Sequence, residues 1–143
     1  MKKLLPTILI VLVFGGYIAF MMLRKPAPTP GVFDARITLA EARQQSAESG
    51  KPILVLATAD WCAPCQGLKR GALTDPAVVE FIREQTIPVY LEDGTNRAEI
   101  RELQVASYPT TLILKGGSVQ AITGGRSADN YLEAIRLAVT NAG

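Results

Sequence analysis

Cys62 and Cys65 are the only cysteines in the chain, and they are separated by two residues in the stretch ADWCAPC (59–65). Two thiols at this spacing can form part of a metal site, close a small disulfide loop or exchange electrons. A structural zinc site usually needs four ligands, and the chain has no histidine to add to the two sulfurs. A disulfide that closes so short a loop stabilises a fold only weakly. The pattern therefore favours redox chemistry without a metal or a separate cofactor.

The cysteines follow Ile53–Ala57, an apolar run typical of a buried parallel strand. A helix is predicted to begin at Cys62, because Pro64 suits its first turn. Free N–H groups at a helix start favour a thiolate, so Cys62 is expected to be the exposed nucleophile. Cys65, one turn further on, is expected to be the more buried thiol that resolves a mixed disulfide. Trp61 would shield one side of the pair.

The rest of the chain predicts helices that alternate with strands. Thr38-Leu-Ala-Glu41 and Asp75-Pro76 are typical helix starts. The predicted helices cover 38–49, 75–85, 96–104 and a segment from about 127 onward, and the predicted strands cover 87–91, 110–114 and 119–123. This order indicates an α/β fold with a central mixed sheet flanked by helices.

The N-terminal part differs in composition. Residues 4–23 are uncharged and almost wholly apolar, and about 20 such residues suffice for a transmembrane helix. We therefore predict a membrane anchor over residues 1–25, with a cleaved signal peptide as the alternative. Lys2 and Lys3 on one side, against Arg24 and Lys25 on the other, slightly favour a domain outside the membrane.

Residues 26–31, PAPTPG, are predicted to be an extended Pro-rich linker that lifts the domain off the bilayer. Residues 32–143 then form one globular domain. The net charge of +2 and the lack of a basic cluster with aromatics argue against nucleic acid as a partner. The absence of histidine excludes a Ser-His-Asp triad and a Cys-His nucleophile pair.

Two stretches together carry a family resemblance. KPILVLATADWCAPC (51–65) and the later Ser107-Tyr108-Pro109-Thr110 resemble the thioredoxin superfamily, from about Ile37 to the C-terminus. The resemblance implies a thioredoxin-like fold and a cis peptide bond before Pro109, beside the disulfide. It also implies that the backbone of Tyr108 pairs with an extended substrate segment, with Trp61 nearby.

A narrower resemblance involves ADWCAPCQ (59–66), LTDPAV (73–78) and LEDGTN (91–96). These segments are similar to the soluble C-terminal domain of Dsb-type bacterial thiol:disulfide interchange reductases and to small membrane-anchored relatives. The resemblance implies a single-pass protein of the bacterial inner membrane whose domain faces the periplasm or the outside. Its partners would be protein disulfide substrates or another thiol redox carrier.

The expected activity is reduction or exchange of disulfides, because Ala63-Pro64 lacks the histidine typical of strongly oxidising relatives. A disulfide oxidase of the same fold and a non-catalytic adaptor at the membrane stay open as alternatives. Leu56 and Tyr90 stand where thioredoxins have a buried aspartate and a lysine. Asp60 and Glu92 are the candidates to move protons instead, although each is expected on a solvated edge.

Overall fold

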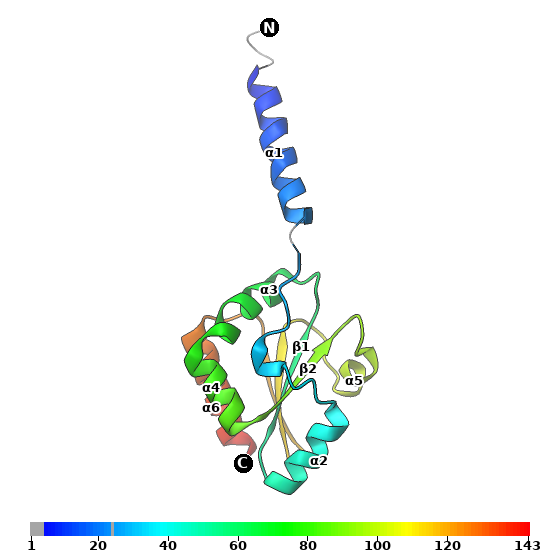
Figure 1. Cartoon of the computed structure of the whole chain (residues 1–143), viewed down its shortest axis with the longest axis vertical. Helices are drawn as coiled ribbons and strands as arrows, with labels where there is room; N and C mark the ends of the chain where they lie inside the picture. Colours follow the sequence, from blue (N-terminus) through cyan, green and yellow to red (C-terminus); the bar gives the residue numbers. More distant parts are fainter. Residues whose placement is uncertain (1–4, 24) are drawn as a thin grey trace.

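A four-stranded mixed sheet lies at the centre of the computed structural model, which describes residues 5–23 and 25–143 (Figure 1). Lys2, Lys3 and Arg24, on which the predicted orientation partly rests, lie outside the described residues. The strand order is β2-β1-β3-β4, with β1 parallel to β2 and antiparallel to β3. The four strands are β1 (Ile53–Thr58), β2 (Ile87–Glu92), β3 (Thr110–Lys115) and β4 (Ser118–Thr123). The predicted mixed sheet is therefore confirmed.

Helices cover both faces of this sheet (Figure 1). They are α2 (Leu39–Ser49), α3 (Ala63–Arg70), α4 (Pro76–Gln85), α5 (Arg97–Glu102) and α6 (Ala128–Ala142), with short 3₁₀ turns η1 (Gly31–Phe33) and η2 (Ala72–Thr74). The predicted helix starts are confirmed. Thr38 and Glu41 form a reciprocal capping box, and the Asp75 carboxylate accepts from the Ala77 and Val78 amides at 2.9 and 3.3 Å.

Strand β1 has all six residues buried because it is central and covered on both faces. Leu54 and Leu56 pack with residues of α3, α4 and α6. Val55 and Ala57, which alternate with them, pack against residues of α2, α5 and β2. The end of β1 thus delivers the following loop, with the cysteines, to the rim between the two helical layers.

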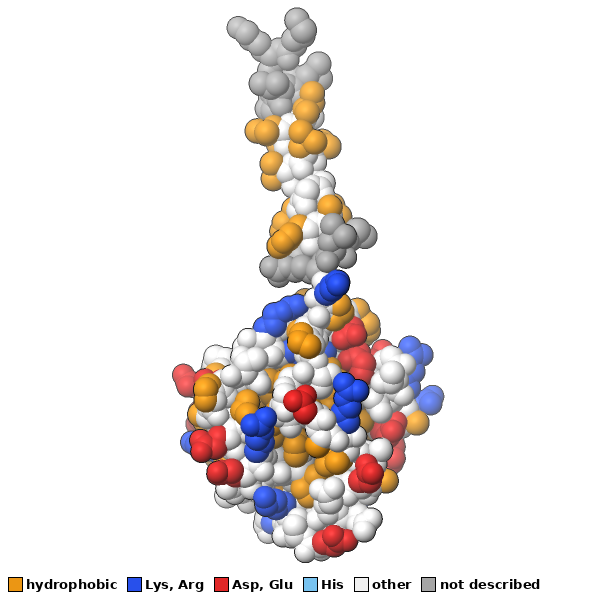
Figure 2. Space-filling view, viewed as in Figure 1, with side chains coloured by type: hydrophobic (Ala, Val, Ile, Leu, Met, Phe, Trp, Pro, Cys, Tyr) orange, Lys and Arg blue, Asp and Glu red, His pale blue; other side chains and the backbone are white. Residues whose placement is uncertain are grey.

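The N-terminal helix α1 (Leu5–Leu23) projects from the domain (Figure 1). Figure 2 shows hydrophobic side chains along it, whereas the domain face in that view carries charges of both signs. Ile10 and Leu12 are each 67% exposed. Even so, none of the helices that the structure describes combines the length and apolar character that a membrane crossing requires.

The Pro-rich segment, predicted as an extended spacer that lifts the domain off the bilayer, instead packs on the domain. Ala27 and Pro30 are buried, and the Ala27 amide donates to Gln66 Oε1 of α3 at 2.5 Å. Arg70 of α3 donates to the Lys25 carbonyl at 3.1 Å. We call residues 25–33 the strap. It holds the point where the chain leaves for α1 beside α3, since side chains of that helix satisfy its backbone groups.

Candidate active site

The two cysteines form a disulfide at the junction between β1 and α3. Their Cα atoms are 5.3 Å apart. Cys62 is the N-cap of α3, and its Sγ accepts from the Cys65 amide at 3.2 Å. Pro64 occupies the first turn, where backbone N–H groups have no partner within the helix, so the N–H that proline lacks costs no hydrogen bond. An amide directed at Sγ and the positive end of the helix dipole would both stabilise a Cys62 thiolate after reduction.

Cys62 is less accessible than the sequence predicts. It is 5% exposed and Cys65 is 1% exposed, so the expected order holds but the nucleophile is not an exposed group. Tyr108 contributes to this cover, because it packs against the cluster of Ala59 and the two cysteines. A distant segment of the chain therefore limits the approach to Cys62, which local sequence patterns do not reveal.

Trp61 and Tyr108 form the rim of the site, and Pro109 directly follows Tyr108 in the chain. The indole is 74% exposed and meets the Tyr108 ring edge to face, with ring centres 5.9 Å apart. The Tyr108 hydroxyl donates to Asp93 Oδ1 at 2.9 Å, which fixes the ring. The Tyr108–Pro109 peptide bond is cis, and Pro109 is buried next to the start of β3. The structure thus brings Trp61 and Tyr108 together beside the disulfide, and Pro109 directly follows Tyr108 through a cis bond.

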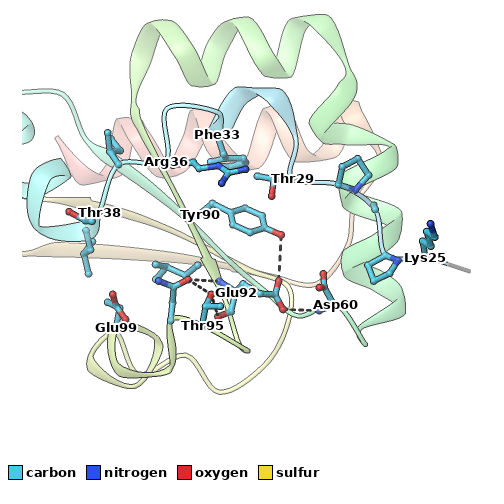
Figure 3. Close-up of a pocket in the computed structure, with 17 residues that line it drawn as sticks. Lys25, Thr29, Phe33, Arg36, Thr38, Asp60, Tyr90, Glu92, Thr95 and Glu99 are labelled. Atoms are coloured by element: carbon cyan, nitrogen blue, oxygen red, sulfur yellow. Dashed lines mark hydrogen bonds between the residues drawn. The ribbon is translucent and has the colours of Figure 1, made fainter.

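Asp60 and Glu92 also meet, but in different surroundings. The Asp60 side chain is 56% exposed, whereas that of Glu92 is 18% exposed and so does not lie on the expected solvated edge. Glu92 Oε1 accepts from the Asp60 amide at 2.8 Å, and Tyr90 Oη lies 3.5 Å from Glu92 Oε2 (Figure 3). Burial raises the pKa of Glu92, and the negative charge of Asp60 adds to this effect.

Lys69 is the residue of this site that sequence reasoning missed. Its side chain is 1% exposed, and Nζ lies 3.3 Å from Asp60 Oδ1 and 3.8 Å from Glu92 Oε2. Nζ also stands 5.3 Å from the centre of the Tyr90 ring. The signal was present, because residues four apart on a helix share a face and Cys65 precedes Lys69 by one turn.

A cavity of about 730 Å³ lies between the strap and the sheet, beside this charged group (Figure 3). Phe33 of η1 and Tyr90 of β2 form part of its wall, with ring centres 5.6 Å apart. Asp60 and Glu92 line it on the side of the active site. Water in this cavity would have direct access to both carboxylates.

Related sequences agree with this geometry. A family profile described as Thioredoxin-like matches residues 34–116. Over 50 residues the chain is 50% identical to the thiol:disulfide interchange protein DsbD 1 of Pseudomonas aeruginosa, a match that covers 35% of this chain and 7% of that protein. The chain spans 23% or less of the length of the first curated relatives that it matches.

Solved structures agree on the fold. A thioredoxin from Thermus thermophilus superposes with a TM-score of 0.64 at 21% identity, covering 73% of this chain and 86% of that one. The oxidised C-terminal domain of DsbD from Neisseria meningitidis superposes with a TM-score of 0.59 at 22% identity, covering 69% and 90%. With its profile match, its sheet topology and its paired cysteines at the start of α3, the chain belongs to the thioredoxin-like family.

Proposed function

We propose that this protein is a thiol:disulfide oxidoreductase that acts on other proteins through Cys62 and Cys65. The observation that carries the proposal is the position of the disulfide at the start of α3, beneath Tyr108 and beside the exposed Trp61. A helix start lowers the pKa of a thiol, and an aromatic rim offers a contact surface for an extended partner segment. The cysteine pair itself carries the electrons, so the reaction needs no further cofactor.

The reaction begins from the reduced pair. The Cys62 thiolate attacks one sulfur of a partner disulfide, a Cys62–partner disulfide forms, and the first partner thiolate leaves. Cys65 then loses its proton and attacks Cys62 Sγ, which restores the Cys62–Cys65 bond and releases the second partner thiolate. The partner gains two electrons and two protons, and the cysteine pair is oxidised. Tyr108 and Pro109 position the partner segment against Cys62.

The direction we propose is reduction or exchange rather than oxidation. Ala63-Pro64 places no histidine beside Cys62, so one means of extreme thiolate stabilisation is absent from the motif. A measured reduction potential tests this choice. A value near the roughly −270 mV of thioredoxin supports a reductase, and one near the roughly −120 mV of DsbA would make the protein an oxidant.

The location we propose is the bacterial inner membrane, with residues 4–23 as anchor and the domain in the periplasm or outside. The apolar sequence of this segment and the exposed apolar side chains of α1 support it. None of the helices among the described residues meets the requirement for a membrane span, so the proposed location rests on the apolar sequence of residues 4–23. The strap would then hold the disulfide end of the domain close to the bilayer.

A trapping experiment tests the function. In Cys65→Ser the mixed disulfide at Cys62 has no resolving thiol, so partner proteins should accumulate as adducts that a reducing agent releases. The Cys62→Ser/Cys65→Ser variant is the matched control, and the adducts should be absent from it. Carbonate-washed membranes should retain the adducts if residues 4–23 anchor the protein. A non-catalytic adaptor would give no adducts with Cys65→Ser and would hold its partner equally well without either cysteine.

A further inference from the structure

A groove of about 580 Å³ lies between the strap and the helix that carries the cysteines. It reaches the active site, because Trp61 and Ala63, the chain neighbours of Cys62, both line it. The lining comes from the strap, the loop after β1 and the helix α3: Lys25, Pro26, Asp60, Trp61, Ala63, Gln66, Gly67 and Arg70. The groove is therefore continuous with the aromatic rim at which a partner segment is proposed to bind.

The side of α3 that lines the groove is not the side that packs in the core. Ala63, Gly67 and Arg70 are exposed and follow one another at spacings of four and three residues, so they share one side of the helix. The opposite side carries the buried Cys65 and Lys69. The groove thus presents groups that the packing of the domain does not use.

Gly67 leaves the middle of the groove open. A Cβ at this position would meet nothing within 4 Å, so none of the described residues lies close enough to require a glycine here. Apart from proline, glycine is the least favourable residue in a helix interior. The bare backbone at Gly67 leaves room for a segment that comes from outside the domain.

Gln66 holds the walls of the groove in place. Its Oε1 accepts from the Ala27 amide of the strap, and its Nε2 donates to the Asp60 carbonyl at 3.1 Å. One side chain therefore joins the strap, α3 and the active-site loop. A groove that is already formed binds a segment at a lower entropic cost than one that must first be assembled.

The charges of the groove favour an anionic segment. Lys25 and Arg70 are exposed on its two walls, and neither is ion-paired with an acid in the part of the chain that the structure describes. Arg70 donates one N–H to the Lys25 carbonyl, which leaves other guanidinium donors for a ligand. Asp60 also lines the groove, but its carboxylate lies 3.3 Å from Lys69 Nζ, which offsets its charge.

We propose that this groove binds an acidic segment beside the reactive disulfide of the partner protein, with Lys25 and Arg70 as the specificity-determining residues. The inference rests on the proposed thiol–disulfide exchange and names the class of partner. The rise of α3 from Cys62 to Arg70 is about 12 Å. An extended segment advances about 3.3 Å per residue, so the acidic residue should stand about three or four residues from the partner cysteine.

Two synthetic peptides test the charge. Each carries one cysteine as its pyridyl disulfide, with glutamate at the third residue on both sides in one peptide and glutamine there in the other. In full-length Cys65→Ser protein in detergent, the Cys62 thiolate attacks the peptide sulfur. A Cys62–peptide disulfide forms, the bond to the pyridyl sulfur breaks, and the departing thiolate takes up a proton from water and is measured by absorbance.

At low salt the glutamate peptide should react about fivefold faster than the glutamine peptide, because opposite charges speed the encounter. At 1 M salt, where the Debye length is about 3 Å, the two rates should lie within about twofold of each other. Lys25→Gln/Arg70→Gln should lose the preference at low salt. Lys51→Gln/Lys115→Gln removes the same charge at the end of the sheet away from the cysteines, and as the matched control it should keep the preference.

A second variant tests the groove by its shape. Gly67→Leu places a large side chain in it, and leucine is a better helix former than glycine, so the fold should not suffer. The rates with both peptides are divided by the rate with dipyridyl disulfide, which corrects for any change in the reactivity of Cys62. This ratio should fall about fivefold, because the new side chain excludes the segment.

Equal rates for the two peptides at low salt, or a preference that Lys25→Gln/Arg70→Gln leaves unchanged, would overturn the proposal. Anionic lipid is the other occupant to test, and Trp61, the only tryptophan of the chain, reports it. Equal peptide rates together with a fluorescence shift of the full chain in phosphatidylglycerol vesicles, absent in phosphatidylcholine, would assign the groove to the bilayer instead. Failure of the proposed function is seen separately, as the absence of protein adducts in the trapping experiment, whereas the peptide rates report the groove alone.

Discussion

Replacing Phe33 with alanine should strongly destabilise the domain, although Phe33 precedes every strand and belongs to the strap. The ring is 1% exposed and packs in the same core cluster as Leu54 and Leu56. It also contacts Tyr90, with ring centres 5.6 Å apart and planes inclined by 55°. Truncation of a buried phenylalanine to alanine typically costs about 3–5 kcal/mol. Of this loss, the aromatic pair accounts for roughly 0.5–1.5 kcal/mol.

Urea denaturation of the oxidised domain, followed by circular dichroism, measures this loss as a lower midpoint at unchanged slope. At roughly 4 °C per kcal/mol for a domain of this size, the thermal midpoint should fall by about 12–20 °C. Leu137→Ala on α6, where the side chain is 57% exposed, is the matched control and should stay within about 0.5 kcal/mol of wild type. A loss below about 1 kcal/mol for Phe33→Ala would show that the strap is not part of the core, and the packing argument would fail.

Two further changes test other parts of the structure. The Tyr131 hydroxyl is buried and lies 2.8 Å from Thr111 Oγ1, so Tyr131→Phe should cost about 1–3 kcal/mol in chemical denaturation, because Thr111 loses its partner. Burial raises the pKa of Tyr131 to about 12, above its ordinary value of 10.0. The stability that this hydroxyl contributes is therefore present below pH 10 and is lost as pH rises through about 12. The Tyr131→Phe variant should not show this pH dependence. A Cβ at Gly125 would lie 3.3 Å from the Pro64 carbonyl oxygen between the cysteines, so Gly125→Ala should displace the loop and slow the attack of reduced Cys62 on the aryl disulfide DTNB. Gly67→Ala, with nothing within 4 Å, is its control, and equal rates in the two variants would refute the contact.

Local rules predicted the elements that build the site. The capping box at Thr38 and the Asp75-Pro76 start follow from hydrogen bonds within one turn of chain, which a sequence displays directly. The apolar run that became β1 needed no information about its neighbours, because burial on both faces demands apolar residues throughout. The helix at Cys62 likewise follows from its own first turn.

What escaped the sequence depends on contacts between distant segments. Tyr108 packs against the cysteine cluster because β3 runs beside β1, and Cys62 is 5% exposed, so its expected exposure was wrong. Residues 26–31, which lie within the strap, were predicted as a spacer because proline-rich segments are commonly extended, and their docking depends on Gln66 and Arg70 of a later helix. Glu92 is largely covered for the same kind of reason, since its surroundings come from α3 and the loop after β1.

The two departures from the thioredoxin pattern, Leu56 and Tyr90, turn out to be register partners on neighbouring strands. An acid and a lysine at these positions would face each other across β1 and β2, whereas here Leu56 is fully buried and the Tyr90 hydroxyl contacts Glu92. In this chain a buried lysine, Lys69, comes from α3, and a largely covered carboxylate, Glu92, stands two residues beyond Tyr90 on β2. Two residues of strand span about 6.6 Å, which moves the carboxylate toward the cysteine end of the sheet and the cavity beside the strap. A carboxylate there lies at the cavity and can exchange protons with water more readily than one enclosed in the core.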